Sequence, residues 1–172
     1  MSNITDNTRK YLLTASDIEA LEGQEITHFL NPNAIRLNKS LGDAVGMSQM
    51  GVHMIAVEPD RDSTEFHKHQ YEEECIYILE GSGELTIEQD TYTVTKGDFI
   101  GFPANEVAHS LFNNSNETLV CLVMGQRLKH DIGDYPNQNK RIYRHNGKAE
   151  VVEYENIAYP KTHAGRKESD EK

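Results

Sequence analysis

The sequence lacks the features on which membrane proteins, secreted proteins and non-specific nucleic-acid-binding proteins depend. None of its apolar runs is long enough to cross a bilayer, and the first residues, MSNITDNTRKYL, lack the basic start and apolar stretch of a secretory signal. Basic residues are few: 17 Lys and Arg stand against 28 Asp and Glu, a formal net charge of -11. This balance argues against binding to nucleic acid or anionic membrane, since both attract clustered Lys and Arg. We expect a cytoplasmic protein.

Cysteine is scarce as well. Cys75 and Cys121 both lie in apolar runs, and they form no CxxC pair that would hold zinc or carry out redox chemistry. We therefore expect two buried, reduced thiols. The chain of 172 residues has the length of one domain and can bury a core without a disulfide.

Helical signals are confined to the N-terminal region. Ser16 followed by Glu19 forms a capping-box pattern, and Gly23 is a plausible stop, so we predict one short helix there. Between residues 25 and 49 Asn, Pro, Gly and Ser recur without a sustained period. We expect residues 1–49 to form an irregular arm with one or two short strands.

From Met50 onward, short apolar runs alternate with turn residues, which is typical of an all-β sandwich or barrel. The segment ELTIEQDTYTVT alternates on both sides of Glu-Gln-Asp and predicts a hairpin. We predict a barrel core over residues 50–126, an extension packed on the barrel over 127–160 with one strand in AEVVEYENI, and a disordered tail over 161–172. The predicted barrel strands are GVHMIAVE, ECIYILEG, GELTIEQ, TYTVTKG, DFIGFP, AHSLFNN and ETLVCLVMG.

One segment of this barrel concentrates imidazole and carboxylate groups. Residues two apart in a strand share a face, so His67 and His69 point the same way, about 6 to 7 Å apart along the backbone. Two imidazoles at this spacing can converge on one ion. Glu74 shares a face with the core residues of the next run, where a carboxylate is costly unless it is paired or metal-bound. Strand parity favours Glu74 over Glu73, and we interpret Glu72 and Glu73 as loop residues.

A third histidine, His109, follows a turn at Gly97 and a strand that ends at Pro103. Two antiparallel segments that deliver imidazole, together with one carboxylate, suit a divalent first-row metal: Mn, Fe, Co, Ni or Zn. Taken singly, a histidine in a strand is more often an ordinary hydrogen-bonded residue than a metal ligand, and the three glutamates are most simply a solvated charge cluster. The metal-site hypothesis therefore rests on the occurrence of all three histidines together with the carboxylate.

The two segments resemble the two sequence motifs of the cupin superfamily. The motif positions are occupied, in order, by His67, His69, Glu74, Gly81, Gly97, Pro103, His109 and Asn113. The resemblance covers residues 50–125 and implies a cupin-type double-stranded β-helix, or jelly-roll barrel. It also implies one metal, held by the three histidines and the glutamate of the motifs at the open end of the barrel. Arms of this kind in cupins commonly add strands to a partner subunit, so we expect a homodimer.

Three positions depart from the motif pattern. Residues 60–62 replace a glycine before the first histidine, and Asn105 replaces a glycine after the proline, but Asp and Asn both tolerate a positive φ. The turn ANEVA is one residue longer than the commonest form. We expect this to shift His109 slightly.

The wider sequence resembles a group of small bacterial cupins that are often labelled sugar or sugar-phosphate isomerases by fold analogy. Our first hypothesis is a metal-dependent enzyme acting on a small polar molecule such as a sugar or sugar phosphate, with Glu74 and His53 as candidate catalytic groups. Arg127 and Lys129 are candidate phosphate contacts, although a solvated loop explains them as well.

Two other functions stay open at this point. With Fe(II) the same site would bind O₂ and a small thiol or aromatic molecule, as in a dioxygenase, and Tyr71 and Tyr77 are the nearest aromatic residues. Alternatively, the metal site captures a small ligand without converting it, which would make the protein a sensing or storage cupin.

Overall fold

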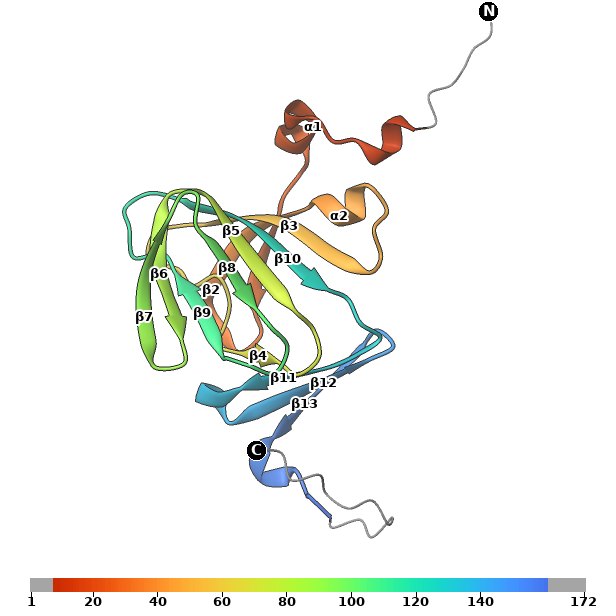
Figure 1. Ribbon diagram of the computed structural model, residues 1–172, viewed down its shortest axis with the longest axis vertical. Helices are drawn as coiled ribbons and strands as arrows, with labels where there is room; N and C mark the ends of the chain where they lie inside the picture. Colours follow the sequence, from red (N-terminus) through yellow and green to blue (C-terminus); the bar gives the residue numbers. More distant parts are fainter. Residues whose placement is uncertain (1–7, 161–172) are drawn as a thin grey trace, which may run out of the picture.

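The computed structural model describes residues 8–160, which fold mainly into antiparallel β-sheets (Figure 1). The tail predicted over residues 161–172 lies outside the described residues. Within them, no helix is long and apolar enough to cross a membrane. The helices are η1 (Arg9–Tyr11), α1 (Ala15–Ala20), α2 (Leu41–Ala44), η2 (Pro136–Gln138) and η3 (Tyr154–Asn156). The strands are β1 (Gln24–His28), β2 (Asn31–Ser40), β3 (Met50–Val57), β4 (Lys68–His69), β5 (Glu74–Glu80), β6 (Ser82–Ile87), β7 (Asp90–Thr95), β8 (Phe99–Phe102), β9 (His109–Phe112), β10 (Leu119–Gln126), β11 (His130–Tyr135), β12 (Lys140–His145) and β13 (Lys148–Glu153).

The barrel strands confirm the predicted all-β jelly-roll architecture. Each of the predicted runs between residues 50 and 125 forms a strand, β3 and β5 to β10. The predicted hairpin is β6 paired with β7, and Glu88 in its turn has a φ of 52°. A six-stranded sheet, in the order β1-β2-β3-β10-β5-β8, faces a three-stranded sheet, β7-β6-β9.

The hydrophobic core lies between these two sheets. Register places Ile55 of β3 opposite Cys121 of β10, and Cys121 opposite Ile78 of β5, so one row of side chains points inward across the sheet. Leu85 and Leu111 meet this row from the other sheet. The buried cluster consists of Ile55, Val57, Ile76, Ile78, Leu85, Val94, Ile100, Phe102, Leu111, Leu119 and Cys121.

Two N-terminal expectations need correction. The capping box of α1 is formed by Thr14 and Asp17, not by Ser16 and Glu19: the Thr14 hydroxyl accepts from the Asp17 amide, and the Asp17 carboxylate accepts from the Thr14 amide at 2.7 Å. The helix therefore begins two residues earlier than predicted.

The arm is also more regular than expected, because β1 and β2 pair with each other and β2 pairs with β3 of the same barrel. Arg36 and Asn38 occupy inward positions of β2, so the strand lacks the apolar period that would have revealed it. These strands belong to the chain's own sheet. The homodimer remains a prediction, which the molecular mass in solution tests.

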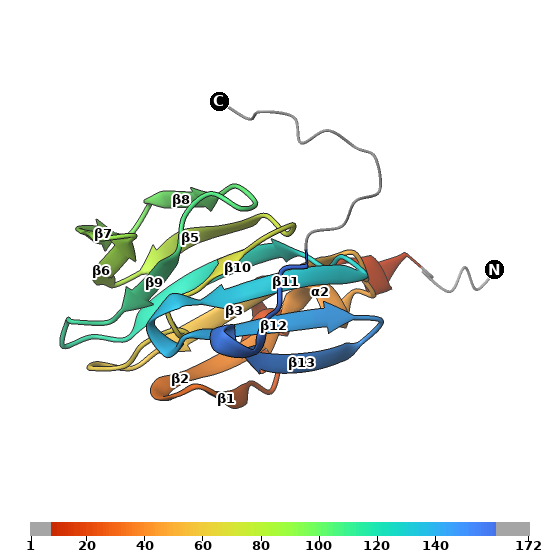
Figure 2. The same ribbon diagram turned by 90° about the horizontal axis from the view of Figure 1, so that it is seen from below.

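A third sheet closes one end of the barrel. β11 pairs with β4 and β12, and β12 pairs with β13. Figures 1 and 2 show β11, β12 and β13 running across the end of the barrel. The sequence predicted a strand near β13 but neither β11 nor β12, whose inward positions are partly charged.

Two motif residues have structural roles. Gly81 has a φ of +78°, and a Cβ there would meet the Thr118 carbonyl oxygen at 2.7 Å. The Asn113 side chain is fully buried, and its Nδ2 donates to the Val57 and Glu117 carbonyl oxygens, each at 2.8 Å. Its Oδ1 accepts from the Ser115 amide at 3.0 Å. Asn113 thereby ties the end of β3 to the turn between β9 and β10.

We predict that Asn113→Ala lowers the free energy of unfolding by about 2–4 kcal/mol, because two carbonyl groups lose their donor and the turn loses an acceptor. Asn114→Ala is the matched control, since Asn114 is exposed. For the control we expect a change within about 0.5 kcal/mol. Urea unfolding followed by circular dichroism measures both variants, and equal stability of the two would contradict this role for Asn113.

Candidate functional site

The three motif histidines lie on two antiparallel segments. His67 immediately precedes β4, His69 ends β4, and His109 begins β9. Backbone hydrogen bonds of 3.0 and 2.8 Å join His67 and His109 in both directions. The His67 ring centroid is 5.0 Å from that of His69 and 4.7 Å from that of His109. Glu74, the first residue of β5, places Oε2 3.7 Å from His69 Nε2.

The structure brings three of the four predicted metal ligands into one group. Ligand atoms of His67, His69 and Glu74 lie within 4.8 Å of one another. His109 lies beside this group but outside it, because its ring stacks on Phe102 with centroids 3.4 Å apart and planes inclined by 3°. Both ring nitrogens of His109 are buried without a well-formed hydrogen bond to the described residues.

Hydrogen bonds fix which nitrogen of each histidine is free. His67 Nδ1 lies 2.8 Å from the Glu65 carbonyl oxygen, which can only accept, so Nδ1 carries the proton and Nε2 keeps its lone pair. His69 Nδ1 lies 2.7 Å from Asp131 Oδ2, with the same consequence. Metal-binding histidines are oriented by this type of contact. Two oriented imidazoles and a carboxylate fit a divalent transition metal.

Burial sets the charge of these groups. It lowers the pKa of His67 well below the ordinary value, helped by the neighbouring histidines, and lowers the pKa of His109 to about 3, against the opposing effect of the Val107 backbone. Burial also opposes protonation of His69, but the hydrogen bond to Asp131 and the Glu74 and Asp131 charges outweigh it and raise the pKa. Burial raises the pKa of Glu74. His67 and His109 are therefore neutral near pH 7.

A buried charge network supports His69 from the C-terminal sheet. Asp131 of β11 accepts hydrogen bonds at 2.7 Å from both His69 and Arg144 of β12. Arg144 also pairs with Glu72, whose Oε1 accepts from the Leu128 amide at 2.8 Å. His69, Glu72 and Asp131 lie close enough to hold an ion, but Arg144 already compensates the two carboxylates. We interpret this group as support for His69.

The histidines and Glu74 line a cavity of about 260 Å³. His53 of β3 also lines it, so both candidate catalytic residues face the same space. His53 Nε2 lies 3.4 Å from Arg127 Nη2, and its Nδ1 is buried without a hydrogen-bond partner among the described residues. Burial and the Arg127 charge lower the pKa of His53. The lining residues are His28, Arg36, Asn38, His53, Ile55, Ser63, Thr64, His67, His69, Glu74, Ile76, His109, Leu111 and Val123.

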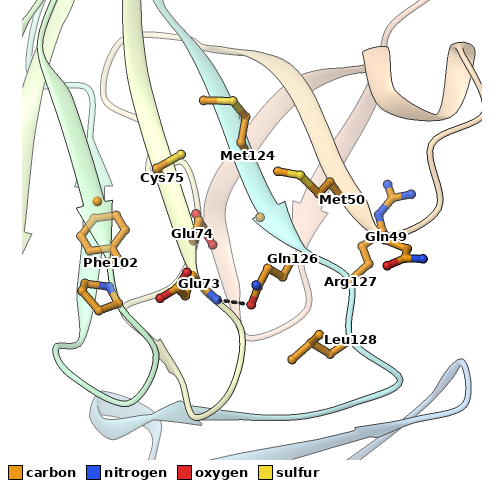
Figure 3. A pocket seen from close by; sticks show the side chains of 13 residues that line it. Gln49, Met50, Glu73, Glu74, Cys75, Phe102, Met124, Gln126, Arg127 and Leu128 are labelled. Atoms are coloured by element: carbon orange, nitrogen blue, oxygen red, sulfur yellow. Dashed lines mark hydrogen bonds between the residues drawn. The ribbon is translucent and has the colours of Figure 1, made fainter.

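A second cavity, of about 570 Å³, lies at the lower end of β5, β8 and β10 (Figure 3). Cys75 and Met124 project into it, and the Glu73 amide donates to Gln126 Oε1 at 3.1 Å. Glu74 lines both this cavity and the smaller one, but its carboxylate oxygen Oε2 lies 3.7 Å from His69 Nε2, which lines the smaller cavity. The three motif histidines, His67, His69 and His109, all line the smaller cavity, which we take as the functional site.

The remaining candidates from the sequence lie away from the donor group. Arg127 forms an ion pair with Asp43, and Lys129 is exposed. Tyr71 and Tyr77 are 57% and 39% exposed.

The two cysteines are free thiols. Cys121 is buried, as expected, and burial raises its pKa to about 12. Cys75 is only partly buried, because it faces the second cavity.

Sequence reasoning missed several groups of the site. Arg36, Asn38 and His28 come from β1 and β2, and Asp131 and Arg144 come from β11 and β12. All of these strands have polar residues at inward positions. The sequence signal for these strands was an alternation of charged residues within short runs. Such a signal predicts a strand only weakly when the intervening positions are not apolar.

Comparison with known proteins gives a consistent family. The family described as "Cupin domain" matches residues 53–125. A crystal structure named "Putative sugar phosphate isomerase", from Acidithiobacillus ferrooxidans, is 54% identical with a TM-score of 0.88 and covers 91% of this chain and 100% of that chain. A crystal structure named as a sugar phosphate isomerase from a cupin superfamily, from Silicibacter pomeroyi, is 25% identical with a TM-score of 0.74. The match covers 87% of this chain and 97% of that chain. An uncharacterized protein of Methanocaldococcus jannaschii is 32% identical over 102 residues, which is 59% of this chain and 71% of that protein.

We predict that Asp131→Asn lowers the pKa of His69 in metal-free protein, because the imidazolium loses its hydrogen-bonded carboxylate. For the wild type we expect the His69 pKa to lie above its ordinary value, because of the Asp131 hydrogen bond, and the His109 pKa to be about 3, because of burial. NMR titration of labelled imidazoles measures both. Asp134→Asn is the matched control, since Asp134 is a buried carboxylate of the same strand that pairs with Arg141. An unchanged His69 titration in Asp131→Asn would refute the role of Asp131.

Proposed function

This chain belongs to the cupin superfamily, and from that premise we propose that it is a metal-dependent enzyme that isomerises a small sugar or sugar phosphate. The observation that carries the proposal is the convergence of His67, His69 and Glu74 on one cavity. The likeness to structures named as sugar phosphate isomerases supports the substrate class. The polar cavity wall, with Arg36, Asn38 and residues 63–64, suits a hydroxyl-rich ligand.

We propose His67, His69 and Glu74 as metal ligands, with His109 as the fourth. His109 is neutral near pH 7, and its unpartnered nitrogens lie in a ring 4.7 Å from that of His67. A divalent ion bound there would act as a Lewis acid toward a carbonyl or hydroxyl oxygen of the sugar. Four protein ligands leave room for such an oxygen.

Glu74 and His53 supply the proton transfers in this proposal. Aldose–ketose isomerisation moves one proton between adjacent carbons and another between their oxygens, so it needs a base and a donor. Glu74 is the one carboxylate among the described residues that line the cavity, and burial raises its pKa, which makes it a stronger base. A carboxylate has two oxygens and can serve as ligand and base. Because Arg127 faces His53 Nε2, the proton of neutral His53 resides on Nδ1, from which it can be donated to a substrate oxygen.

The first test is the metal content of protein purified without chelator. We expect a divalent transition metal in the wild type, near-complete loss in His67→Ala, and at least ten-fold weaker binding in His109→Ala, on the order expected for a lost ligand. His145→Ala is the matched control, because His145 lies on β12 and is 40% exposed. Elemental analysis and chelator competition measure these effects. Full metal retention in both variants would defeat the site.

The second test is proton exchange during isomerisation. Metal-loaded protein incubated with pentose or hexose phosphates in D₂O should incorporate deuterium at the carbon next to the carbonyl, as observed by proton NMR. We expect Glu74→Gln to reduce exchange by about 10²–10⁴-fold. Glu73→Gln is the matched control, because Glu73 is the adjacent carboxylate and does not line the cavity that holds the histidines. This variant should retain deuterium exchange.

His53→Gln should slow product formation, because the substrate oxygen loses the imidazole that donates a proton to it. Metal analysis of every variant separates loss of the metal from loss of proton transfer. Sugar phosphates that stabilise the metal-loaded protein without any exchange would overturn the isomerase proposal in favour of a binding role.

A further inference from the structure

Arg36 places a positive charge in the wall of the metal-site cavity. It lies on β2, two residues before Asn38, and both line the cavity. Its Nη1 donates to the Ser63 carbonyl oxygen. Across the described chain, no carboxylate lies within the 4.0 Å ion-pair distance of its guanidinium. Arg36 therefore keeps most of its donors free.

Arg36 differs in this respect from Arg127, one of the two cationic residues that the sequence suggested as phosphate contacts. Arg127 forms a bidentate contact with Asp43. Arg36 feels the Glu74 charge through the cavity, but burial lowers its pKa by more than Glu74 raises it. A guanidinium remains charged at neutral pH even so. A charge held in a partly buried wall without a carboxylate partner is costly, and perturbed groups of this kind cluster at binding sites.

The neighbours of Arg36 present further hydrogen-bond donors. His28 Nδ1 accepts from the Leu30 amide at 3.2 Å, so the neutral ring carries its proton on Nε2. Burial and the Arg36 charge lower the pKa of His28 to about 4, which keeps the ring neutral near pH 7. Asn38 adds an amide. This wall combines one fixed positive charge with neutral donors.

The charges of the cavity indicate what it binds. Among the residues that line the cavity, Glu74 supplies one negative charge and Arg36 one positive charge, and histidines bind a metal ion as neutral imidazoles. A divalent ion on the donor group would leave the site about two positive charges in excess. A phosphate monoester carries about −1.5 to −2 charges at pH 7. An uncharged sugar would leave the Arg36 charge without a partner.

We propose that Arg36, with His28 and Asn38, forms an oxyanion subsite that holds the phosphate or carboxylate group of the substrate beside the metal ligands. Guanidinium groups bind both oxyanions through paired hydrogen bonds. The inference deepens the proposed function, on which it rests, because it restricts the substrates to anionic sugars such as sugar phosphates or sugar acids.

Calorimetric titration of metal-free and metal-loaded protein tests this subsite. The probes are inorganic phosphate, acetate and glucose, each at the same ionic strength set with chloride. We expect phosphate, acetate or both to bind the metal-free wild type, and Arg36→Gln to weaken that binding about ten-fold or more. The stronger of the two anions identifies the group that the subsite prefers. Glucose should not respond to the substitution.

Arg61→Gln is the matched control, because it removes the same charge from an arginine that donates to Asn33 and does not line the cavity. Its anion binding should equal that of the wild type. Arg36→Lys keeps the charge but loses the guanidinium fork, so we expect an intermediate loss, and it replaces Arg36→Gln if that variant does not fold. Circular dichroism of each variant establishes its folding.

The outcomes separate this inference from the proposed function. Anion binding that is unchanged in the folded Arg36 variant, equal in Arg36→Gln and Arg61→Gln, or absent from the wild type overturns the subsite, whatever the metal content. Arg36-dependent anion binding in a protein that takes up no metal would support the subsite and defeat the proposed enzyme.

Discussion

The hydrogen bond between His69 and Asp131 is the contact on which the donor group depends. It joins β4, which carries His69, to β11, which closes the end of the barrel, at a distance of 2.7 Å. Because Asp131 holds the proton of His69 on Nδ1, Nε2 is left to face Glu74. Arg144 balances the Asp131 charge, and the ion pair between Arg144 and Glu72 extends the network to the loop before β5. The C-terminal sheet is therefore part of the site and not only a cover for the barrel.

The inward face of the six-stranded sheet forms the hydrophobic core at one end and the wall of the histidine-lined cavity at the other. Toward β6 and β9 its inward side chains are apolar and form the core, with Ile55, Cys121 and Ile78 in one row. Toward the opposite end of the same strands they are polar and form the cavity, with Arg36 and His53 among them. The apolar half supplies the rigidity that holds the polar half in place, and burial by that core gives His67 and His109 their low pKa.

The sequence was informative where side chains pack and weak where they bind. The β3 and β5 to β10 strands follow from apolar alternation, and the positive φ of Asp60 and Asn105, 60° in each case, agrees with the residue types that replace the motif glycines. β2 and β11 could not be predicted in this way, because their inward positions carry residues such as Arg36 and Asp131. The grouping of His67, His69 and Glu74 follows from spacing and strand parity. The stacking of His109 on Phe102 depends on a three-dimensional fit between β8 and β9 that no local pattern contains.

The His69–Asp131 contact spans 62 positions of the chain, so its two halves leave the ribosome well apart in time. The first motif is already synthesised when β11 and β12 are still to be made, and until then the His69 imidazole is free to exchange its proton between nitrogens. Contacts of such long range are costly to form early, because the intervening chain must first lose its conformational freedom. The orientation of His69 in the donor group is consequently a product of late folding, because it waits for Asp131 to be synthesised and packed.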